Sequence, residues 1–109
     1  MTGFDPNDSD SRDRLLELHD RLRTVLELPV ERDASNWIGE SEALVRDLVD
    51  RGASPEVRRK RLAKVKELLD EVEATGELQA DEHVAAARRI TAELLAESEN
   101  SDDDARSPP

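Results

Sequence analysis

Apolar residues recur every three or four positions along four stretches of this chain, the pattern of an amphipathic helix, and no stretch shows the alternation of a strand. The first helix is expected to end before Pro29, because the residue before a proline avoids the α region. Ser35 or Asn36 is the expected N-cap of the second helix, and Gly52 is its expected end. The first stripe comprises Leu15, Leu18, Leu22 and Val25, flanked by Leu16 and Leu26; the second comprises Trp37, Ser41, Leu44 and Leu48, with Ile38, Val45 and Val49 beside it.

The third and fourth helices follow from the same spacing. Ser54 is expected to cap the third helix, with Pro55 at its first position, where the missing N–H of proline costs nothing, and Gly76 is expected to end it. The fourth helix is expected to begin near Asp81. Gly39, inside the second helix, is expected to allow close packing against another helix. The third stripe comprises Leu62, Val65, Leu69 and Val72, with Leu68 at its edge; the fourth comprises Val84, Ala87, Thr91 and Leu94, widened by Ile90 and Leu95.

Four amphipathic helices with short connections predict an all-α, antiparallel up-and-down four-helix bundle, comprising residues 14–96. Residues 1–13 and 97–109 lack apolar periodicity and are expected to be disordered acidic tails. These tails carry net charges of −3 and −4 out of the formal −11 of the chain, so the domain between them is nearly balanced. The absence of cysteine excludes disulfides and thiol chemistry. The sequence shows neither a signal peptide nor an apolar run long enough for a membrane span, so a cytoplasmic protein is expected.

A block of six basic residues without an acidic one lies between positions 57 and 66, at the start of the third predicted helix. On a helix these charges spread around the axis, whereas helices that read a DNA groove present their contacts on one side. Acidic residues dominate the rest of the same helix, so the block is expected to pair with acids of a neighbour, either those of an antiparallel fourth helix or those of a second copy. The basic residues are Arg58, Arg59, Lys60, Arg61, Lys64 and Lys66, and the expected acids of the fourth helix are Glu93, Glu97 and Glu99.

Two strings, PVERDASNWIGESEALV at 29–45 and VEATGELQADEHVAAARRI at 72–90, resemble a family of uncharacterised small acidic helical proteins from haloarchaea. The shared features are a Pro-Val-x-Arg connection, a helix start with tryptophan, and an Ala-Asp-Glu-His-Val-Ala turn into the last helix. The resemblance covers residues 14–96 and implies a helical fold and a salt-loving organism, but no activity. The 13 Arg against 3 Lys, beside 27 acids, are also typical of proteins from a cytoplasm with molar potassium.

Candidate catalytic and metal-binding groups are few. His19 and His83 lie on different predicted helices, and although Asp20 or Glu82 could join them at a metal, a structural zinc site needs four Cys or His ligands. A packing or capping role is therefore favoured for both histidines. Adjacent carboxylates carry no catalytic information in a chain with 27 acids, and the four glycines stand singly, which excludes a Gly-rich phosphate loop. No enzymatic activity, cofactor or metal is expected.

Trp37 is the only tryptophan, and buried tryptophans dominate both cores and interface hot spots. We favour the core for its side chain. The sequence as a whole predicts a non-enzymatic interaction or adaptor module of a haloarchaeal cytoplasm, whose partner is another protein or a second copy, with no small-molecule substrate and no membrane indicated. The alternative is a nucleic-acid-associated regulator that uses the basic start of the third helix. The candidate interaction residues are Trp37, Arg58, Arg59, Lys60, Arg61, Lys64 and Lys66.

Overall fold

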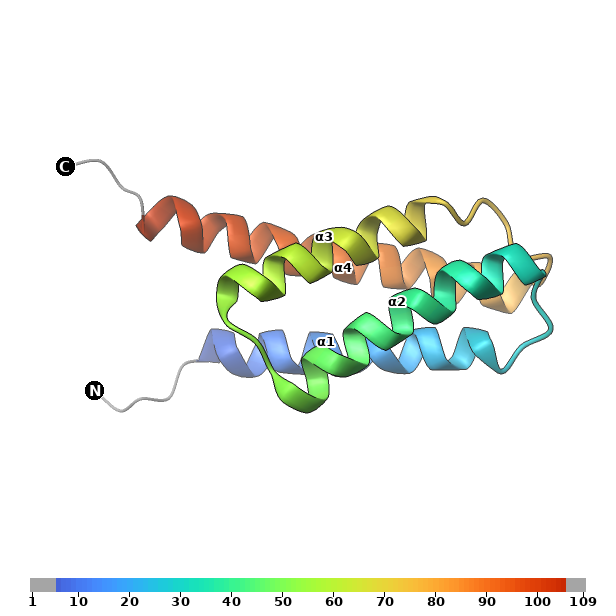
Figure 1. Cartoon of the computed structure of the whole chain (residues 1–109), viewed down its shortest axis with the longest axis horizontal. Helices are drawn as coiled ribbons and strands as arrows, with labels where there is room; N and C mark the ends of the chain where they lie inside the picture. The colour runs from blue at the N-terminus through green and yellow to red at the C-terminus, as the bar shows by residue number, and fades with distance from the viewer. Residues whose placement is uncertain (1–5, 106–109) are drawn as a thin grey trace.

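The computed structural model describes the backbone of residues 6–105 and the side chains of residues 11–97. Its elements are the four α-helices α1 (Pro6–Leu26), α2 (Arg32–Arg51), α3 (Pro55–Asp70) and α4 (Leu78–Ala105). Each helix runs antiparallel to the one before it, and α4 returns alongside α1, so the helices close a ring around one core (Figure 1). The predicted all-α four-helix bundle is therefore confirmed.

The core consists of the apolar stripes of α1, α3 and α4, as the spacing predicts. Leu16 and Leu26, expected at the edge of the first stripe, stay 43% and 37% exposed, which shows that the stripe has the predicted width. Burying one such aliphatic side chain stabilises the fold by about 1.5–3 kcal/mol, so these stripes supply most of the driving force. The buried stripe residues are Leu15, Leu18, Leu22 and Val25 of α1, Leu62, Val65, Leu68 and Leu69 of α3 with Val72 just beyond it, and Val84, Ala87, Ile90, Thr91 and Leu94 of α4.

The core face of α2 is rotated from the predicted one. Trp37 is only half-buried and packs against the core from the side, while the adjacent Ile38 is fully buried. The helix α2 also begins earlier than predicted, at Arg32 rather than at Ser35 or Asn36, with the carbonyl of Glu31 accepting a hydrogen bond from the Ser35 N–H at 2.8 Å. The first turn contributes the buried Ala34, which lies on the same face as Ile38. The buried residues of α2 are Ala34, Ile38, Ser41, Glu42, Val45 and Leu48.

The connection between α2 and α3 has the predicted caps. Gly52 has a φ of 70°, and its N–H donates to the carbonyl of Leu48 at 3.0 Å, which ends α2. Ser54 caps α3 by accepting the N–H of Val57 at 3.3 Å, with Pro55 in the first turn. Gly39 does not have its predicted role, because a Cβ at this position would have no atom within 4 Å. No helix packs closely against it.

The end of α3 differs from the prediction, because α3 stops at Asp70 and not at Gly76. Arg88 of α4 explains the early end: its Nη2 donates to the carbonyl of Leu69 at 2.8 Å and also to that of Val72. A guanidinium at a helix C-terminus satisfies the free carbonyls and complements the negative end of the helix dipole. The helix α4 then starts at Leu78, three residues before the predicted start.

Both outer helices extend beyond the predicted domain boundaries, since α1 begins at Pro6 and α4 continues to Ala105. The two extensions meet where Glu97 accepts a hydrogen bond from the Ser11 hydroxyl at 2.8 Å and binds Arg14. Residues 6–13 and 97–105 are thus helical, and the remainder of the predicted tails, 1–5 and 106–109, lies outside the described residues. Within 6–105, none of the helices combines the length and the apolarity that crossing a bilayer requires.

Candidate functional site

The basic block at the start of α3 is divided between different partners. Arg61 binds Asp47 of α2, and the second oxygen of that carboxylate lies 3.4 Å from Nε of Arg51. Asp47 thus joins the end of α2 to α3 by sharing its charge between two guanidinium groups. The partly buried Arg61 is therefore part of the α2–α3 interface.

The lysines of the block lie on the outer surface of α3. Lys64 Nζ is 3.9 Å from Glu67 Oε1, and Lys66 Nζ is 3.1 Å from Asp70 Oδ2, both within one helical turn. Exposed pairs of this kind contribute at most about 1 kcal/mol each. Lys60 is exposed as well, whereas Arg58 and Arg59 are partly buried. The six charges thus surround the helix and do not form one stripe.

The acids that α4 was expected to offer the basic block bind α1 instead. Arg14 of α1 has its Nε 3.4 Å from Glu93 Oε1, and its Nη1 binds Glu97. The expectation is therefore wrong for Glu93 and Glu97, and the side chain of Glu99 lies outside the described residues. The reason is the ring order of the bundle, in which α4 packs between α1 and α3 and its last described turns present these carboxylates to α1.

The two histidines occupy separate helix interfaces. His19 Nε2 lies 2.7 Å from Oε2 of Glu42, between α1 and α2, while His83 Nδ1 lies 3.1 Å from Nη1 of Arg21, between α4 and α1. One ring nitrogen of each histidine therefore binds a side chain of a neighbouring helix. In the described part of the chain, no three His, Asp or Glu side chains come together as metal ligands would.

A hollow of about 340 Å³ lies between the start of α2 and the segment that follows α3. Trp37 forms part of its wall together with apolar atoms of Ala34 and Val72. Carboxylate side chains from the start of α2 and from the segment after α3 also line the hollow, and none of its lining residues is basic. The acidic lining residues are Glu31 and Asp33, at the start of α2, and Glu71 and Glu73, after α3.

Thr75, in the connection between α3 and α4, holds the two walls of this hollow together. Its carbonyl accepts the N–H of Glu31 at 2.9 Å, which ties the connection to the start of α2 at the same end of the bundle (Figure 1). Its own N–H donates to Oδ1 of Asp81 at 2.9 Å, and its hydroxyl lies 2.8 Å from the same oxygen. The Thr75 N–H, and after it the hydroxyl, hold the pKa of Asp81 below its ordinary value, against a smaller opposing effect of burial.

Gly76 completes the turn with a φ of 82°, and a Cβ there would lie 3.4 Å from Cγ of Glu31. The positive φ thus favours glycine next to one wall of the hollow, while a Cβ there would meet Glu31 only at an ordinary contact distance. Sequence reasoning identified Trp37 but missed its acidic neighbours. The sequence predicts a helix that reaches Gly76, and in such a helix the side chains of residues 71–73 would point elsewhere. The acidic run itself was the only signal in the sequence.

The comparisons with known proteins identify a family and no function. No curated protein and no solved structure matches the chain. A family model does match, over residues 14–101, and its description is a domain of unknown function, DUF8152. Residue 14 is also where the sequence predicts the domain to begin. The matched range includes α2, α3 and the connection that lines the Trp37 hollow. Because this match spans most of its length, the chain belongs to the DUF8152 family.

Proposed function

We propose that this protein is a non-enzymatic interaction module that binds a lysine or arginine side chain of a partner protein in the Trp37 hollow. The observation that carries the proposal is a half-buried tryptophan in a cavity whose charged lining groups are four carboxylates. An indole face attracts a cation within about 6 Å, and the contribution grows from about 0.5 kcal/mol to about 2 kcal/mol as the pair is desolvated. Carboxylates around that face add charge-assisted hydrogen bonds to the same cation.

The size of the hollow supports one inserted side chain and not a whole peptide. Its 340 Å³ is at the lower end of the range for ligand pockets, about 300–1,000 Å³. Tryptophans in such pockets are typical hot spots, because a few residues dominate the binding energy of most interfaces. The partner surface around the inserted side chain then contributes shape complementarity more than affinity.

The proposed setting is the cytoplasm of a salt-loving archaeon, which the acidic, arginine-rich composition supports. Molar salt shortens the Debye length to about 3 Å, so attraction between separated charges is lost and only groups in contact interact strongly. A cation in contact with Trp37 and the adjacent carboxylates retains its interactions under such conditions. A surface patch of basic residues does not.

The alternative, a nucleic-acid-associated regulator that uses the basic start of α3, has less support. Arg61, Lys64 and Lys66 lie in ion pairs with acids, which would have to be broken to contact phosphate. About six phosphate contacts would also lose about five decades of affinity for a tenfold rise in salt. Tight binding of duplex DNA that persists in molar KCl would favour this alternative over the module.

The fluorescence of Trp37 tests the proposal directly, because this is the only tryptophan of the chain. We expect a tri-arginine peptide to change the emission saturably, while the uncharged tri-citrulline analogue has little effect. The double variant Glu71→Gln/Glu73→Gln should weaken the response about tenfold, since two of the four carboxylates are lost. The variant Asp50→Asn is the control, because this exposed acid does not line the hollow. An equal response to both peptides, or one that the double variant leaves unchanged, would exclude the hollow as a site for cations.

A further inference from the structure

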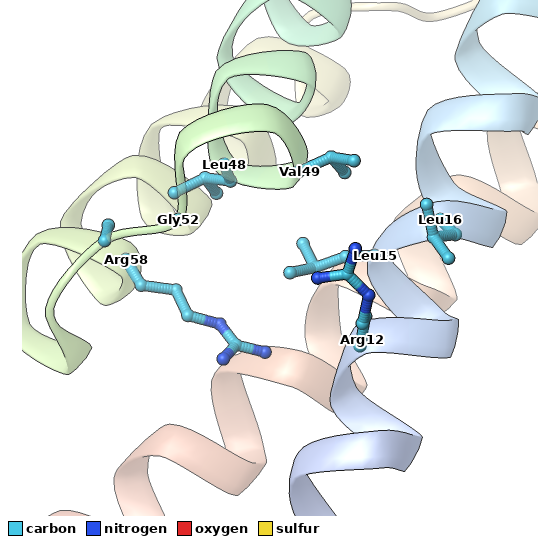
Figure 2. A pocket seen from close by; sticks show the side chains of 8 residues that line it. Arg12, Leu15, Leu16, Leu48, Val49, Gly52 and Arg58 are labelled. Carbon is cyan, nitrogen blue, oxygen red and sulfur yellow. The ribbon is translucent and has the colours of Figure 1, made fainter.

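A second hollow, of about 270 Å³, lies at the opposite end of the bundle, between α1, the end of α2 and the start of α3. Its apolar lining includes Leu15, Leu16, Leu48 and Val49, and its charged lining groups are the guanidinium groups of Arg12 and Arg58 (Figure 2). Leu48 follows Trp37 by eleven positions in α2, about 16 Å along the helix axis. The two hollows are therefore independent, and their charges are opposite.

Arg58 has a buried donor without an acceptor. Its Nε is inaccessible to solvent and makes no hydrogen bond with any of the described residues. Buried donors in native proteins have partners in the great majority of cases, so this N–H requires an acceptor that the described chain does not provide. Among the side-chain nitrogens and oxygens of the described residues, it is the one buried atom with this deficit. It belongs to a residue that lines a hollow, so a rotation of the guanidinium would bring this N–H to an acceptor that enters there.

Arg12 brings a second positive charge to the same hollow. Figure 2 shows the two arginine side chains extending into it from opposite walls, Arg12 from α1 and Arg58 from α3. Other arginines of the bundle, such as Arg14 and Arg61, have carboxylate partners. No ion pair to Arg12 or Arg58 occurs among the residues whose side chains are described, and no acid lines the hollow. Two like charges facing one space favour the binding of an anion between them.

We propose that this hollow binds a small organic carboxylate with an apolar tail. The carboxylate lies between the two guanidinium groups and, once the Arg58 guanidinium rotates toward it, accepts the Nε–H in the fork geometry that arginine offers to carboxylates. The tail packs on Leu15, Leu16, Leu48 and Val49, which is why the ligand must be amphipathic and not a bare anion. This site does not depend on the proposed function, because it shares no lining residue with the Trp37 hollow.

Hexanoate is a suitable probe, with hexanol and acetate as controls that lack the charge and the tail, respectively. We expect methyl NMR spectra of the full chain to show saturable shifts at Leu16, Leu48 and Val49 on titration with hexanoate at millimolar concentrations. Hexanol and acetate should bind at least about tenfold more weakly, since each loses one of the two kinds of contact. Equal affinity for hexanol would show an apolar cavity only. Inorganic phosphate that binds as tightly as hexanoate would show a simple anion site. Either result, or no shift at all, overturns the proposal.

Two variants connect the binding to the arginines. Arg58→Gln should weaken hexanoate binding about tenfold and leave the weak hexanol binding unchanged. Arg12→Gln should weaken it severalfold, and because Arg12 is exposed, this variant tests the site even if Arg58→Gln fails to fold. Arg23→Gln, an exposed arginine in the last turn of the same helix, is the matched control and should bind as the wild type does. Unchanged hexanoate affinity in the Arg12 variant would refute the two-arginine site.

Discussion

His19 Nε2 lies 2.7 Å from Oε2 of Glu42 across the α1–α2 interface, and the two side chains are only 18% and 11% exposed. We expect His19→Ala to lower the free energy of unfolding by about 1–3 kcal/mol, because it leaves a buried carboxylate with one distant partner, Arg46 at 3.7 Å. The control is Glu17→Gln, which removes an exposed partner of Arg21 and should cost less than about 1 kcal/mol.

Urea denaturation of His19→Ala, of Glu42→Ala and of the double variant His19→Ala/Glu42→Ala measures the coupling between the two side chains. A coupling energy near zero would show that this contact contributes nothing beyond the packing of each residue.

Arg88 and Arg89 are adjacent but differ in their contacts, which makes them a matched pair. Arg88 donates to the carbonyl of Leu69, in the last turn of α3, and to that of Val72, just beyond the helix. Arg89 is exposed. We expect Arg88→Ala to destabilise the protein by about 1–3 kcal/mol and Arg89→Ala to change stability by less than about 0.5 kcal/mol. Thermal melts followed by circular dichroism give both values. Similar melting temperatures for the two variants would contradict the capping role of Arg88.

The three stripes of α1, α3 and α4 were predictable because each contains one clear helical series, such as Leu15, Leu18, Leu22 and Val25. The buried face of α2 was not predictable, because its apolar residues come in adjacent pairs, among them Trp37 with Ile38 and Leu44 with Val45. Either member of a pair continues a stripe. The bundle buries Ile38 and Val45, on the face that also carries Ala34, a residue that the predicted start of the helix leaves out.

The candidate sites depend on contacts between distant residues, and for that reason the sequence revealed them only in part. The composition singled out Trp37, but the acids beside it follow the end of α3, which Arg88 determines from 16 residues away. Arg58 was identified as one charge of a basic block. The burial of its Nε depends on how the helices pack, which the sequence pattern does not show.

Gly39 and Gly76 should respond in opposite directions to alanine. Gly39→Ala adds a methyl group that meets no atom within 4 Å, in the interior of α2, where alanine is preferred over glycine by about 1 kcal/mol. We expect it to raise the melting temperature. Gly76→Ala should lower the stability by about 1–2 kcal/mol, because its φ of 82° disfavours any side chain. A loss of stability in Gly39→Ala would show that the residue has a role that the bundle alone does not require.

Asp81 should make the stability depend on acidic pH. The Thr75 N–H and hydroxyl lower the pKa of Asp81 in the folded protein, so the carboxylate stabilises the fold above its ordinary pKa of about 4. This contribution disappears as the pH falls below about 4 through the lower folded-state value. We therefore expect Asp81→Asn to cost most at neutral pH and progressively less in acid. Denaturation at several pH values, with Glu82→Gln as the exposed neighbouring control, measures the difference.

Salt should stabilise this protein if its acidic composition is an adaptation to a salt-rich cytoplasm. The chain has a formal charge of −11, and its repulsion is screened as the Debye length falls from about 10 Å at 0.1 M KCl to about 3 Å at 1 M. Exposed ion pairs such as Lys66–Asp70 weaken under the same conditions, but each contributes at most about 1 kcal/mol. We therefore expect helix content and melting temperature to rise between about 0.1 and 2 M KCl.

A charge-reduced variant separates repulsion from other effects of the salt. In this variant, four exposed acids that form no ion pair in the described structure are replaced by their amides, which removes four negative charges without breaking an ion pair. The melting temperature of the variant should therefore rise less steeply with KCl than that of the wild type. A flat or falling wild-type curve would exclude salt adaptation, and equal slopes in the two proteins would show that the stabilisation does not come from charge screening. The acids to replace are Glu40, Asp50, Glu56 and Glu82.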